Sequence, residues 1–421
     1  MKFDTIIIGG GLSGLTCGIT LARAGQRVAI VAGGQSTLHF YSGSMELLGS
    51  DGKGNDVTHP LEAIDALDAQ HPYRKIGAGR VAQLAEQAKS LLADAGIKTV
   101  GKAAANHYRL TPMGVTKPAW LTLERLVTTN QADRLPWKRV AVVNLTGFID
   151  FPIDFLLSGL SQLGCEASVM DVTLPVLRKA RRSATEMRAT SLAKVFANSQ
   201  AVWQLATAIN EAMPDEAEVV LLPAVLGIEN DDVCDKLKAQ VQKPLHFLAT
   251  LPPAVTGVRL SAALRHYFQM LGGRYLLGDT ASMAVVDNNR LTELRTTKLQ
   301  AMPMQAEHYV LATGSFMSRG LESNFDRIYE PLLDLDVNAP ELREQWSHYG
   351  VMGDQPYMSV GVLTDEAFHP LKQGKPLSNV YAIGQLLAGH NPLVMGDGTG
   401  VSMLTALAVA EAIINEKGNS I

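Results

Sequence analysis

Three glycines near the start of the sequence have the spacing of a phosphate-binding turn. Residues 9–14 read GGGLSG, which places Gly9, Gly11 and Gly14 in a GxGxxG pattern. The first glycine permits the turn, the second leaves room for a pyrophosphate, and the third lets a helix pack closely against a strand. Amides at a helix start, with about +0.5 elementary charge of helix dipole, favour an anion there. We expect Gly9, Gly11, Ser13 and Gly14 to bind the phosphate of a nucleotide cofactor; a turn without a ligand is the alternative.

The elements around this turn are those that such a site requires. The sequence predicts an apolar strand over residues 3–8, a helix over residues 15–24 that stops at Gly25, and a second strand over residues 27–31. Parallel strands need a crossover that packs a helix on the sheet, so this succession indicates a βαβ unit. The glycine-rich turn lies between its first strand and its helix.

Three distant stretches resemble strand–turn segments of flavoproteins. Residues 309–314 read YVLATG, residues 379–385 read NVYAIGQ, and residues 396–401 read GDGTGV ahead of a final helix. The second has Gln385 where flavoproteins have an acidic residue, but an amide also bonds a flavin ribityl hydroxyl. Each stretch alone is equally a structural turn, yet their order predicts flavin binding. The expected contacts are Ala312, Thr313, Gly314, Gly384, Gln385, Gly398, Gly400 and Val401.

The end of the second strand bears on which flavin is bound. An acidic residue ordinarily stands there and hydrogen-bonds the adenosine ribose, but this sequence has Ala32. The departure favours FMN, which has no adenosine half, and FAD is the alternative. It also argues against a nicotinamide-dependent dehydrogenase.

Composition and charge exclude several classes of protein. The 421 residues exceed one ordinary hydrophobic core, so two or three connected domains are expected. A net charge of −4 gives no general footprint for nucleic acid. Cys17, Cys165 and Cys234 lie far apart, so neither an iron–sulfur cluster nor another metal site is expected. Without a visible targeting segment or a run of about 18 apolar residues, we expect a cytoplasmic chain whose membrane association comes through partners.

The remaining pattern predicts a doubly wound α/β domain of the FAD/NAD(P)-binding Rossmann type with an inserted α/β domain. The elements expected beyond the first unit are helices over 80–95 and 260–271, a strand–helix–strand unit over 139–172, strands over 218–222 and 245–251, hairpins over 281–310, and a strand, glycine-rich loop and helix over 379–414. We expect the flavin domain to comprise residues 1–100 and 251–421, and the insertion residues 101–250.

A further set of stretches narrows the family. Residues 34–48, GQSTLHFYSGSMELL, resemble the B subunits of the anaerobic glycerol-3-phosphate dehydrogenases. Other stretches that resemble this family are residues 71–73, 184–189, 250–253 and 361–366, with the glycine-rich C-terminal segment. They span nearly the whole chain and are more specific than GxGxxG alone.

The resemblance implies membership of a quinone-linked enzyme with several different subunits. That family oxidises sn-glycerol 3-phosphate to dihydroxyacetone phosphate and passes electrons through flavin towards quinone in anaerobic respiration. The resemblance implies that this chain binds FMN and joins the A subunit in a catalytic dimer. It also implies that the dimer is anchored at the inner face of the cytoplasmic membrane by an iron–sulfur C subunit. A flavin accepts a hydride and releases electrons singly, which suits transfer from an alcohol to an iron–sulfur chain.

Two histidines are candidates for the catalytic base. His39 follows the second strand, where flavoproteins bring the chain towards the isoalloxazine, and His390 precedes the last glycine-rich loop. An imidazole takes an alcohol proton near neutral pH as a hydride leaves. A structural histidine or a contact with the A subunit is the alternative for His39.

Other polar residues are candidates for binding. Ser42, Gly43 and Ser44 are expected to bond the cofactor. Arg259 and Arg319, and with them Arg188, are candidates for an anionic substrate or the flavin phosphate, because arginine presents a bidentate donor fork. Most arginines instead solvate a surface or pair with carboxylates, and Arg188 is equally placed to contact the A subunit.

Two alternatives to the preferred function stay open. In the first, the chain serves electron transfer by flavin and assembly of the complex, and the A subunit oxidises the substrate. In the second, the nucleotide fold is empty and the chain is a non-catalytic structural subunit.

Overall fold

A five-stranded parallel sheet forms the centre of the first lobe. The computed structural model describes residues 1–180, 187–229, 231–350 and 353–418. The strands in spatial order are β13 (Arg274–Leu277), β2 (Val28–Ala32), β1 (Lys2–Ile8), β16 (Gln305–Leu311) and β21 (Val380–Ala382). The five residues of β2 and the last four of β1 are buried, as expected of parallel strands covered on both faces.

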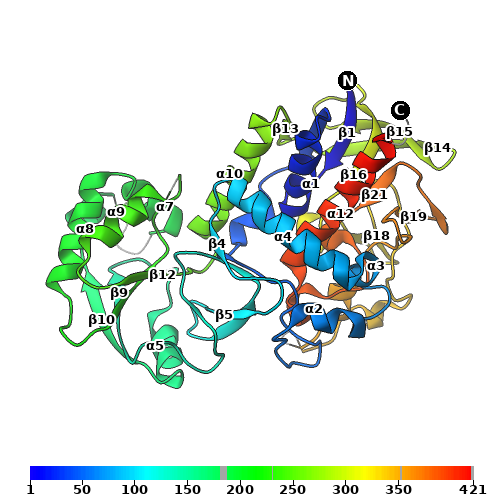
Figure 1. Ribbon diagram of the computed structural model, residues 1–421. Helices are drawn as coiled ribbons and strands as arrows, with labels where there is room; N and C mark the ends of the chain where they lie inside the picture. The colour runs from blue at the N-terminus through cyan, green and yellow to red at the C-terminus, as the bar shows by residue number, and fades with distance from the viewer. Residues whose placement is uncertain (181–186, 230, 351–352, 419–421) are drawn as a thin grey trace.

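Helices from separate parts of the chain pack in the lobe of this sheet. They are α1 (Leu12–Arg23), α4 (Ala78–Asp94), α10 (Val255–Met270) and α12 (Gly398–Gly418). α12 packs against α1 and α4 in the same lobe (Figure 1). By length and composition alone, residues 398–416 of α12 would suit a membrane span, but most of this stretch is buried inside the protein. α12 is therefore placed here as a core helix.

A second parallel sheet forms the other lobe. Its strands in order are β10 (Glu166–Val172), β9 (Arg139–Leu145), β11 (Val219–Pro223) and β12 (Leu245–Leu248). The helices of this lobe are α5 (Ile153–Gln162), α6 (Pro175–Ala180), α7 (Ala189–Val195), α8 (Ser199–Glu211) and α9 (Asp232–Gln240). Figure 1 shows this lobe beside the first. Its sheet lies within the predicted insertion of residues 101–250, whose exact boundaries stay a prediction.

Antiparallel strands complete the molecule. One sheet joins β3 (Ser44–Met45), β7 (Leu121–Leu123) and β4 (Thr99–Val100); another joins β6 (Thr116–Ala119), β5 (His107–Leu110) and β8 (Thr128–Thr129). The two-stranded pairs are β14 (Ala281–Asp287) with β15 (Arg290–Thr296), β17 (Glu322–Ser323) with β18 (Ile328–Tyr329), and β19 (Leu371–Lys372) with β20 (Lys375–Pro376).

Several short helices lie in the connections. The α-helices are α2 (Pro60–Ala63), α3 (Pro72–Ile76) and α11 (Pro392–Met395). The 3-10 helices are η1 (Thr37–Phe40), η2 (Ile64–Ala66), η3 (Phe316–Ser318), η4 (Arg343–Gln345), η5 (Pro356–Ser359) and η6 (Gly384–Leu386).

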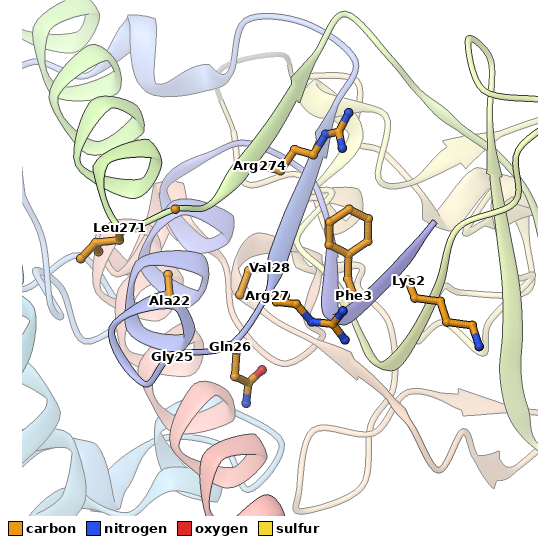
Figure 2. Close-up of a pocket in the computed structure, with 10 residues that line it drawn as sticks. Lys2, Phe3, Ala22, Gly25, Gln26, Arg27, Val28, Leu271 and Arg274 are labelled. Carbon is orange, nitrogen blue, oxygen red and sulfur yellow. The ribbon is translucent and has the colours of Figure 1, made fainter.

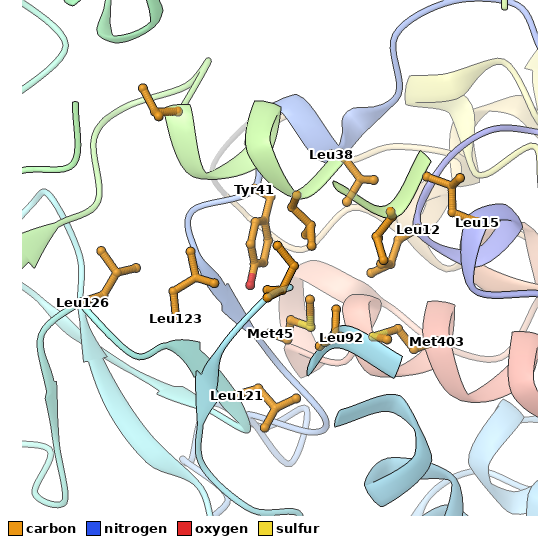
Figure 3. Packing of buried hydrophobic residues seen from close by; sticks show 14 of the residues in the cluster. Leu12, Leu15, Leu38, Tyr41, Met45, Leu92, Leu121, Leu123, Leu126 and Met403 are labelled. Carbon is orange, nitrogen blue, oxygen red and sulfur yellow. The ribbon is translucent and has the colours of Figure 1, made fainter. Parts of the chain in front are cut away.

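A shared apolar core holds the chain after β2 against the first lobe. Figure 3 shows Tyr41 and Met45 of this segment among leucines that come from α1, α4 and β7. Burying each large apolar side chain contributes roughly 1.5–3 kcal/mol. The segment that was expected to face the flavin is thus fixed by packing on elements far apart in the sequence.

Most elements predicted from the sequence are confirmed, but the hairpins predicted over residues 281–310 are only partly so, because residues 305–311 form β16, a parallel strand of the central sheet. The first βαβ unit is β1, α1 and β2, and the unit predicted over residues 139–172 is β9, α5 and β10. The hairpin predicted after residue 281 is β14 with β15. Helix boundaries differ by a few residues, which is usual at frayed ends. Of the family-like stretch 184–189, residues 184–186 lie outside the described residues.

Gly14 tests whether the glycine turn is fixed by packing. A Cβ on Gly14 would collide with the carbonyl oxygen of Gly9, and backbone does not yield easily. We expect Gly14→Ala to lower the free energy of unfolding by about 1–3 kcal/mol, measured by urea denaturation. Gly79→Ala in α4 is the matched control: its Cβ meets open space, and alanine favours a helix by up to about 1 kcal/mol. Equal stability of the two variants would contradict this.

Candidate flavin site

Two of the three motif glycines are required by the protein's own packing. Gly9 has φ +118°, and a Cβ on it would collide with the carbonyl oxygen of Ala312 at the end of β16. A Cβ on Gly14 would likewise collide with the carbonyl oxygen of Gly9. These contacts bring β1, β16 and the start of α1 together, so the free amides of α1 point out of the sheet's carboxyl edge.

Gly11 has no such structural reason to be glycine. A Cβ on Gly11 would meet only the Cβ of Ser36, at 3.9 Å, and its φ of −83° suits any residue. Gly11 also begins α1, and no side chain caps this helix. Nearby, the Thr313 hydroxyl is covered but has no hydrogen-bond partner among the described residues. An open space before uncapped helix amides fits the phosphate of a flavin nucleotide.

The late predicted segments converge on this turn. The amide of Ala312 donates to the carbonyl of Ile8 at 2.8 Å. This bond places Thr313 and Gly314 directly beside the glycine turn. A Cβ on Gly384 would lie 2.7 Å from the Ser13 hydroxyl, and the Gly384 amide donates to Thr405 in α12 at 2.9 Å. The structure therefore brings together residues from four parts of the chain.

The start of α12 is partly occupied by the protein itself. The amide of Gly400 donates to the carbonyl of Glu46 and that of Val401 to the carbonyl of Asp397, each at 2.8 Å. The predicted flavin contacts through these two amides therefore gain no support. The amides of Gly398 and Thr399 precede the first intrahelical bond. The Gln385 amide lies beside them, 2.8 Å from where a Cβ on Gly398 would stand.

The serines after β2 are bonded to protein groups that the sequence did not suggest. Arg109 donates to the Ser42 hydroxyl at 2.7 Å and to Glu46 at 2.9 Å. Thr399 in turn donates to the Glu46 backbone at 3.0 Å. Gly43, with φ +102°, leaves no room for a side chain against Leu126. Arg109 lies in no recognised motif and Glu46 was not singled out within residues 34–48, so only the fold reveals this network.

Ser44 belongs to a buried polar chain. His107 bonds the Thr122 hydroxyl at 2.7 Å, and Thr122 donates to Ser44 at 2.9 Å. Burial lowers the pKa of His107 to about 4. The neutral ring then fixes β3 against β7 behind the segment that follows β2.

The two candidate bases have different surroundings. His39 lies in η1 against α10, and its backbone carbonyl accepts the Ala254 amide at 3.1 Å. Burial and then the charge of Arg265 lower the pKa of His39, and no described residue hydrogen-bonds its ring. His390 is buried, and its Nδ1 lies 3.2 Å from Asp397. Only His390 has a carboxylate that orients it, which favours His390 as the base.

Asp397 also bonds a second buried histidine, His71, at 2.9 Å. Burial alone would raise the pKa of Asp397, but the charge and hydrogen bond of His390 and the hydrogen bond of His71 hold it well below its usual range. The carboxylate is therefore ionised although it is fully buried. The sequence singled out residues 71–73, residues 396–401 and His390 separately but did not predict that they meet, because 326 residues separate His71 from Asp397.

The three candidate arginines each have another partner. Arg259 pairs with Asp231 at the start of α9, which Arg125 also contacts. The Arg319 side chain is 83% exposed and pairs with Glu322. Arg188 pairs with Asp150 at 2.9 Å. Binding of an anion by these arginines stays a prediction that the geometry does not favour.

At the end of β2, where Ala32 stands, no neighbouring carboxylate among the described residues is free to bond an adenosine ribose. The Tyr275 hydroxyl donates to the carbonyl of Gly10 at 3.1 Å and lies close to this end of the strand. The buried carboxylate of Asp279, after β13, already accepts from Thr296, Thr297 and the Lys298 amide. It is therefore committed to the protein and does not replace the missing ribose acid.

A cavity of about 410 Å³ lies at the opposite edge of the sheet from the glycine turn. Figure 2 shows it lined by Lys2 and Phe3 from the start of β1, and by Arg27 and Arg274. Ligands of open α/β sheets bind outside the carboxyl ends of the strands. This cavity is thus separate from the candidate flavin site.

Comparison with known proteins agrees with the geometry. The FAD binding domain family matches residues 4–401. The B subunit of the anaerobic glycerol-3-phosphate dehydrogenase from Yersinia pestis is 43% identical over 99% of both chains. The chain belongs to this family of B subunits. The relative of the same name from Pasteurella multocida is 36% identical over 99% of this chain and 100% of its own.

Solved structures similar to this chain are more distant. A 3-ketosteroid Δ1-dehydrogenase from Sterolibacterium denitrificans aligns with 99% of this chain and 100% of its own, at 11% identity and a TM-score of 0.43. A quinol fumarate reductase from E. coli aligns with 100% and 71% at 8% identity, with the same TM-score. The fold class, an FAD-binding α/β domain with parallel sheets, follows from the family match and the sheet topology.

Gly11→Ala separates cofactor binding from folding. Because the added methyl group meets open space in the protein, we expect unchanged stability of the flavin-free form. Flavin affinity should fall at least about tenfold, or 1.4 kcal/mol, because the methyl group enters the space for the phosphate. Flavin titration followed by fluorescence measures this; unchanged affinity would mean that the phosphate does not lie at Gly11.

The lowered pKa of His107 predicts that the protein loses stability in mild acid. Its pKa is about 4 in the folded protein and about 6.5 when unfolded, so the unfolded chain binds an extra proton between these values. The free energy of unfolding should therefore fall as the pH drops from 6.5 to 4, by up to about 1.4 kcal/mol per pH unit from this residue. Urea denaturation of the wild type and His107→Gln across this range measures the difference. Parallel curves for the two proteins would show that folding does not lower the pKa of His107.

Proposed function

We propose that this chain is the flavin-carrying B subunit of an anaerobic glycerol-3-phosphate dehydrogenase. In the complex, sn-glycerol 3-phosphate is oxidised to dihydroxyacetone phosphate, and the electrons leave through flavin towards quinone. The observation that carries the proposal is the 43% identity over 99% of both chains to a relative of that name. The open space at Gly11 supports it, because packing does not explain this glycine.

The residues of this chain have separable tasks in the proposed reaction. Gly11 and the first amides of α1 hold the flavin phosphate, and Gln385 with the first amides of α12 orients the rest of the cofactor. A bound flavin accepts a hydride and passes electrons on singly. His390 takes the hydroxyl proton of the substrate. The buried core around Tyr41 and Met45 keeps the segment after β2 in place.

A second candidate function places substrate oxidation in the A subunit. The surroundings of the two arginines expected to bind the substrate phosphate favour this alternative. Arg259 is paired with Asp231, and Arg319 is exposed and paired with Glu322. In this case the chain relays electrons and His390 has no substrate. A purely structural role is disfavoured by the open, uncapped start of α1.

FMN remains the proposed form of the flavin within this FAD-type domain, and FAD is its alternative. The proposal rests on Ala32 and on the commitment of Asp279 to three protein donors. We also propose the A subunit and an iron–sulfur C subunit as partners, and a location at the inner face of the cytoplasmic membrane through them. The names of the relatives, which are subunits, support the existence of partners.

Reduction by substrate in the absence of oxygen tests the function. We expect sn-glycerol 3-phosphate to bleach the flavin absorbance of the chain purified with the A subunit, and sn-glycerol 1-phosphate to leave it unchanged. Bleaching of the isolated chain would assign the oxidation to this chain, whereas bleaching only with the A subunit would favour the relay. Failure to bleach in both preparations would contradict the proposed function. Mass analysis of the flavin released by denaturation identifies FMN or FAD.

A further inference from the structure

A buried histidine–carboxylate–histidine cluster joins α3 to the start of α12. His71, Asp397 and His390 are all more than nine-tenths buried. The carboxylate lies between the rings, bonding Nε2 of His71 at 2.9 Å and Nδ1 of His390 at 3.2 Å. A buried carboxylate is costly unless it is paired and hydrogen-bonded. Both of its oxygens are paired here, so the three groups form one unit.

The hydrogen bonds determine where the protons lie. Nδ1 of His71 accepts the Tyr73 amide at 3.1 Å, so the proton of this ring is on Nε2 and points at Asp397. An ionised carboxylate only accepts, so His390 must carry a proton on Nδ1. In neutral His390 the lone pair is therefore on Nε2. This atom has no partner among the described residues and is not fully covered.

The cluster is attached to the candidate flavin site through the backbone. Asp397 directly precedes α12, and its carbonyl accepts the Val401 amide at 2.8 Å. Gly398, the next residue, lies against Gln385. Thr399 donates to the Glu46 carbonyl, which belongs to the segment after β2. A shift of Asp397 would move the amides that face the cofactor as well as His390.

We propose that Asp397, held by His71, is a positioning residue that fixes the tautomer of His390 and presents its Nε2 as the proton acceptor at the flavin site. This inference rests on the proposed function, because it needs an alcohol substrate there. Nε2 would accept the hydroxyl proton of the secondary alcohol, and a flavin bound here would accept the hydride from the carbon that bears this hydroxyl, which leaves the ketone. Asp397 stabilises the imidazolium that forms.

Other charged and titratable groups near the cluster are accounted for. Tyr73 lies against the ring of His71, with 4.9 Å between centroids, and donates its hydroxyl to the carbonyl of Leu47. Asp354 bonds Asn391, next to His390, at 3.2 Å. The Glu46–Arg109 ion pair lies beyond Thr399. Asp397 is the only carboxylate among the described residues that bonds the His390 ring.

The pH profile of flavin reduction tests the positioning role. In the complex with the A subunit, the reduction rate should rise with pH as His390 loses its proton. His390→Gln should lower the plateau rate about 10²- to 10⁴-fold. Asp397→Asn should lower both the plateau and the pH midpoint, because the imidazolium loses its counter-charge. His71→Asn keeps an acceptor for the Tyr73 amide, but its shorter side chain withdraws the donor from Asp397, so it should move the midpoint upwards.

Controls distinguish positioning from loss of structure. Flavin content and melting temperature of each variant are measured first. His308→Gln changes a half-buried histidine of β16 outside the cluster, and this variant should match the wild type in rate and midpoint. Unchanged midpoints in Asp397→Asn and His71→Asn would overturn the proposal. So would an unchanged rate in His390→Gln.

A second measurement does not depend on turnover. Nitrogen NMR of the full chain labelled at histidine reports the tautomer of His390. We expect Nδ1–H in the wild type and a loss of this preference in Asp397→Asn; an Nε2–H ring in the wild type would overturn the proposal. If the substrate does not reduce the flavin of the wild-type complex, the proposed function fails, and the tautomer alone then decides whether Asp397 positions His390.

Discussion

The close approach of β1, β16 and α1 is the constraint on which the rest of the flavin domain depends. No side chain can stand at Gly9 or Gly14, because backbone from Ala312 and from the turn itself occupies the space. Backbone packed against backbone fixes the direction of α1, and with it the amides at its start. Gly11 is the exception within the motif. Its surroundings are open, so folding does not require a glycine there, whereas a bound cofactor would.

The C-terminal segment completes the site because it is tied to three earlier parts of the chain. Gly384 lies against Ser13 of α1, Gly400 donates to Glu46 after β2, and Asp397 bonds His71 at the start of α3. α12 is mostly buried and packs on α1 and α4, so its first residues have little freedom. The charge of the buried Asp397 carboxylate is therefore stabilised by His71 and His390 rather than by water.

The sequence predicted the fold class and the position of the glycine-rich turn because both depend on local patterns. Apolar runs, the GxGxxG spacing and the helix stop at Gly25 each occur within a few residues. His390 was predicted as a candidate base, but its cluster with Asp397 and His71 was not predictable in this way, because His71 comes from a distant segment. Arg259 shows what residue type alone leaves out: an arginine suits a phosphate, but here it is paired with Asp231 of the other lobe, so its binding of an anion stays a prediction. Ser42 and Ser44 accept hydrogen bonds from Arg109 and Thr122, which the sequence did not predict, and their bonds to the cofactor stay a prediction.

The central claim is that a flavin phosphate lies at Gly11 and that the isoalloxazine reaches the start of α12. A crystal structure of the flavin-loaded chain tests it most directly. We predict a phosphate oxygen within about 3.2 Å of an amide in the turn around Gly11, and the isoalloxazine beside Gln385 and Gly398. A flavin bound in the cavity at the amino ends of the strands, or at any place that leaves the space before Gly11 filled with solvent, would contradict the account.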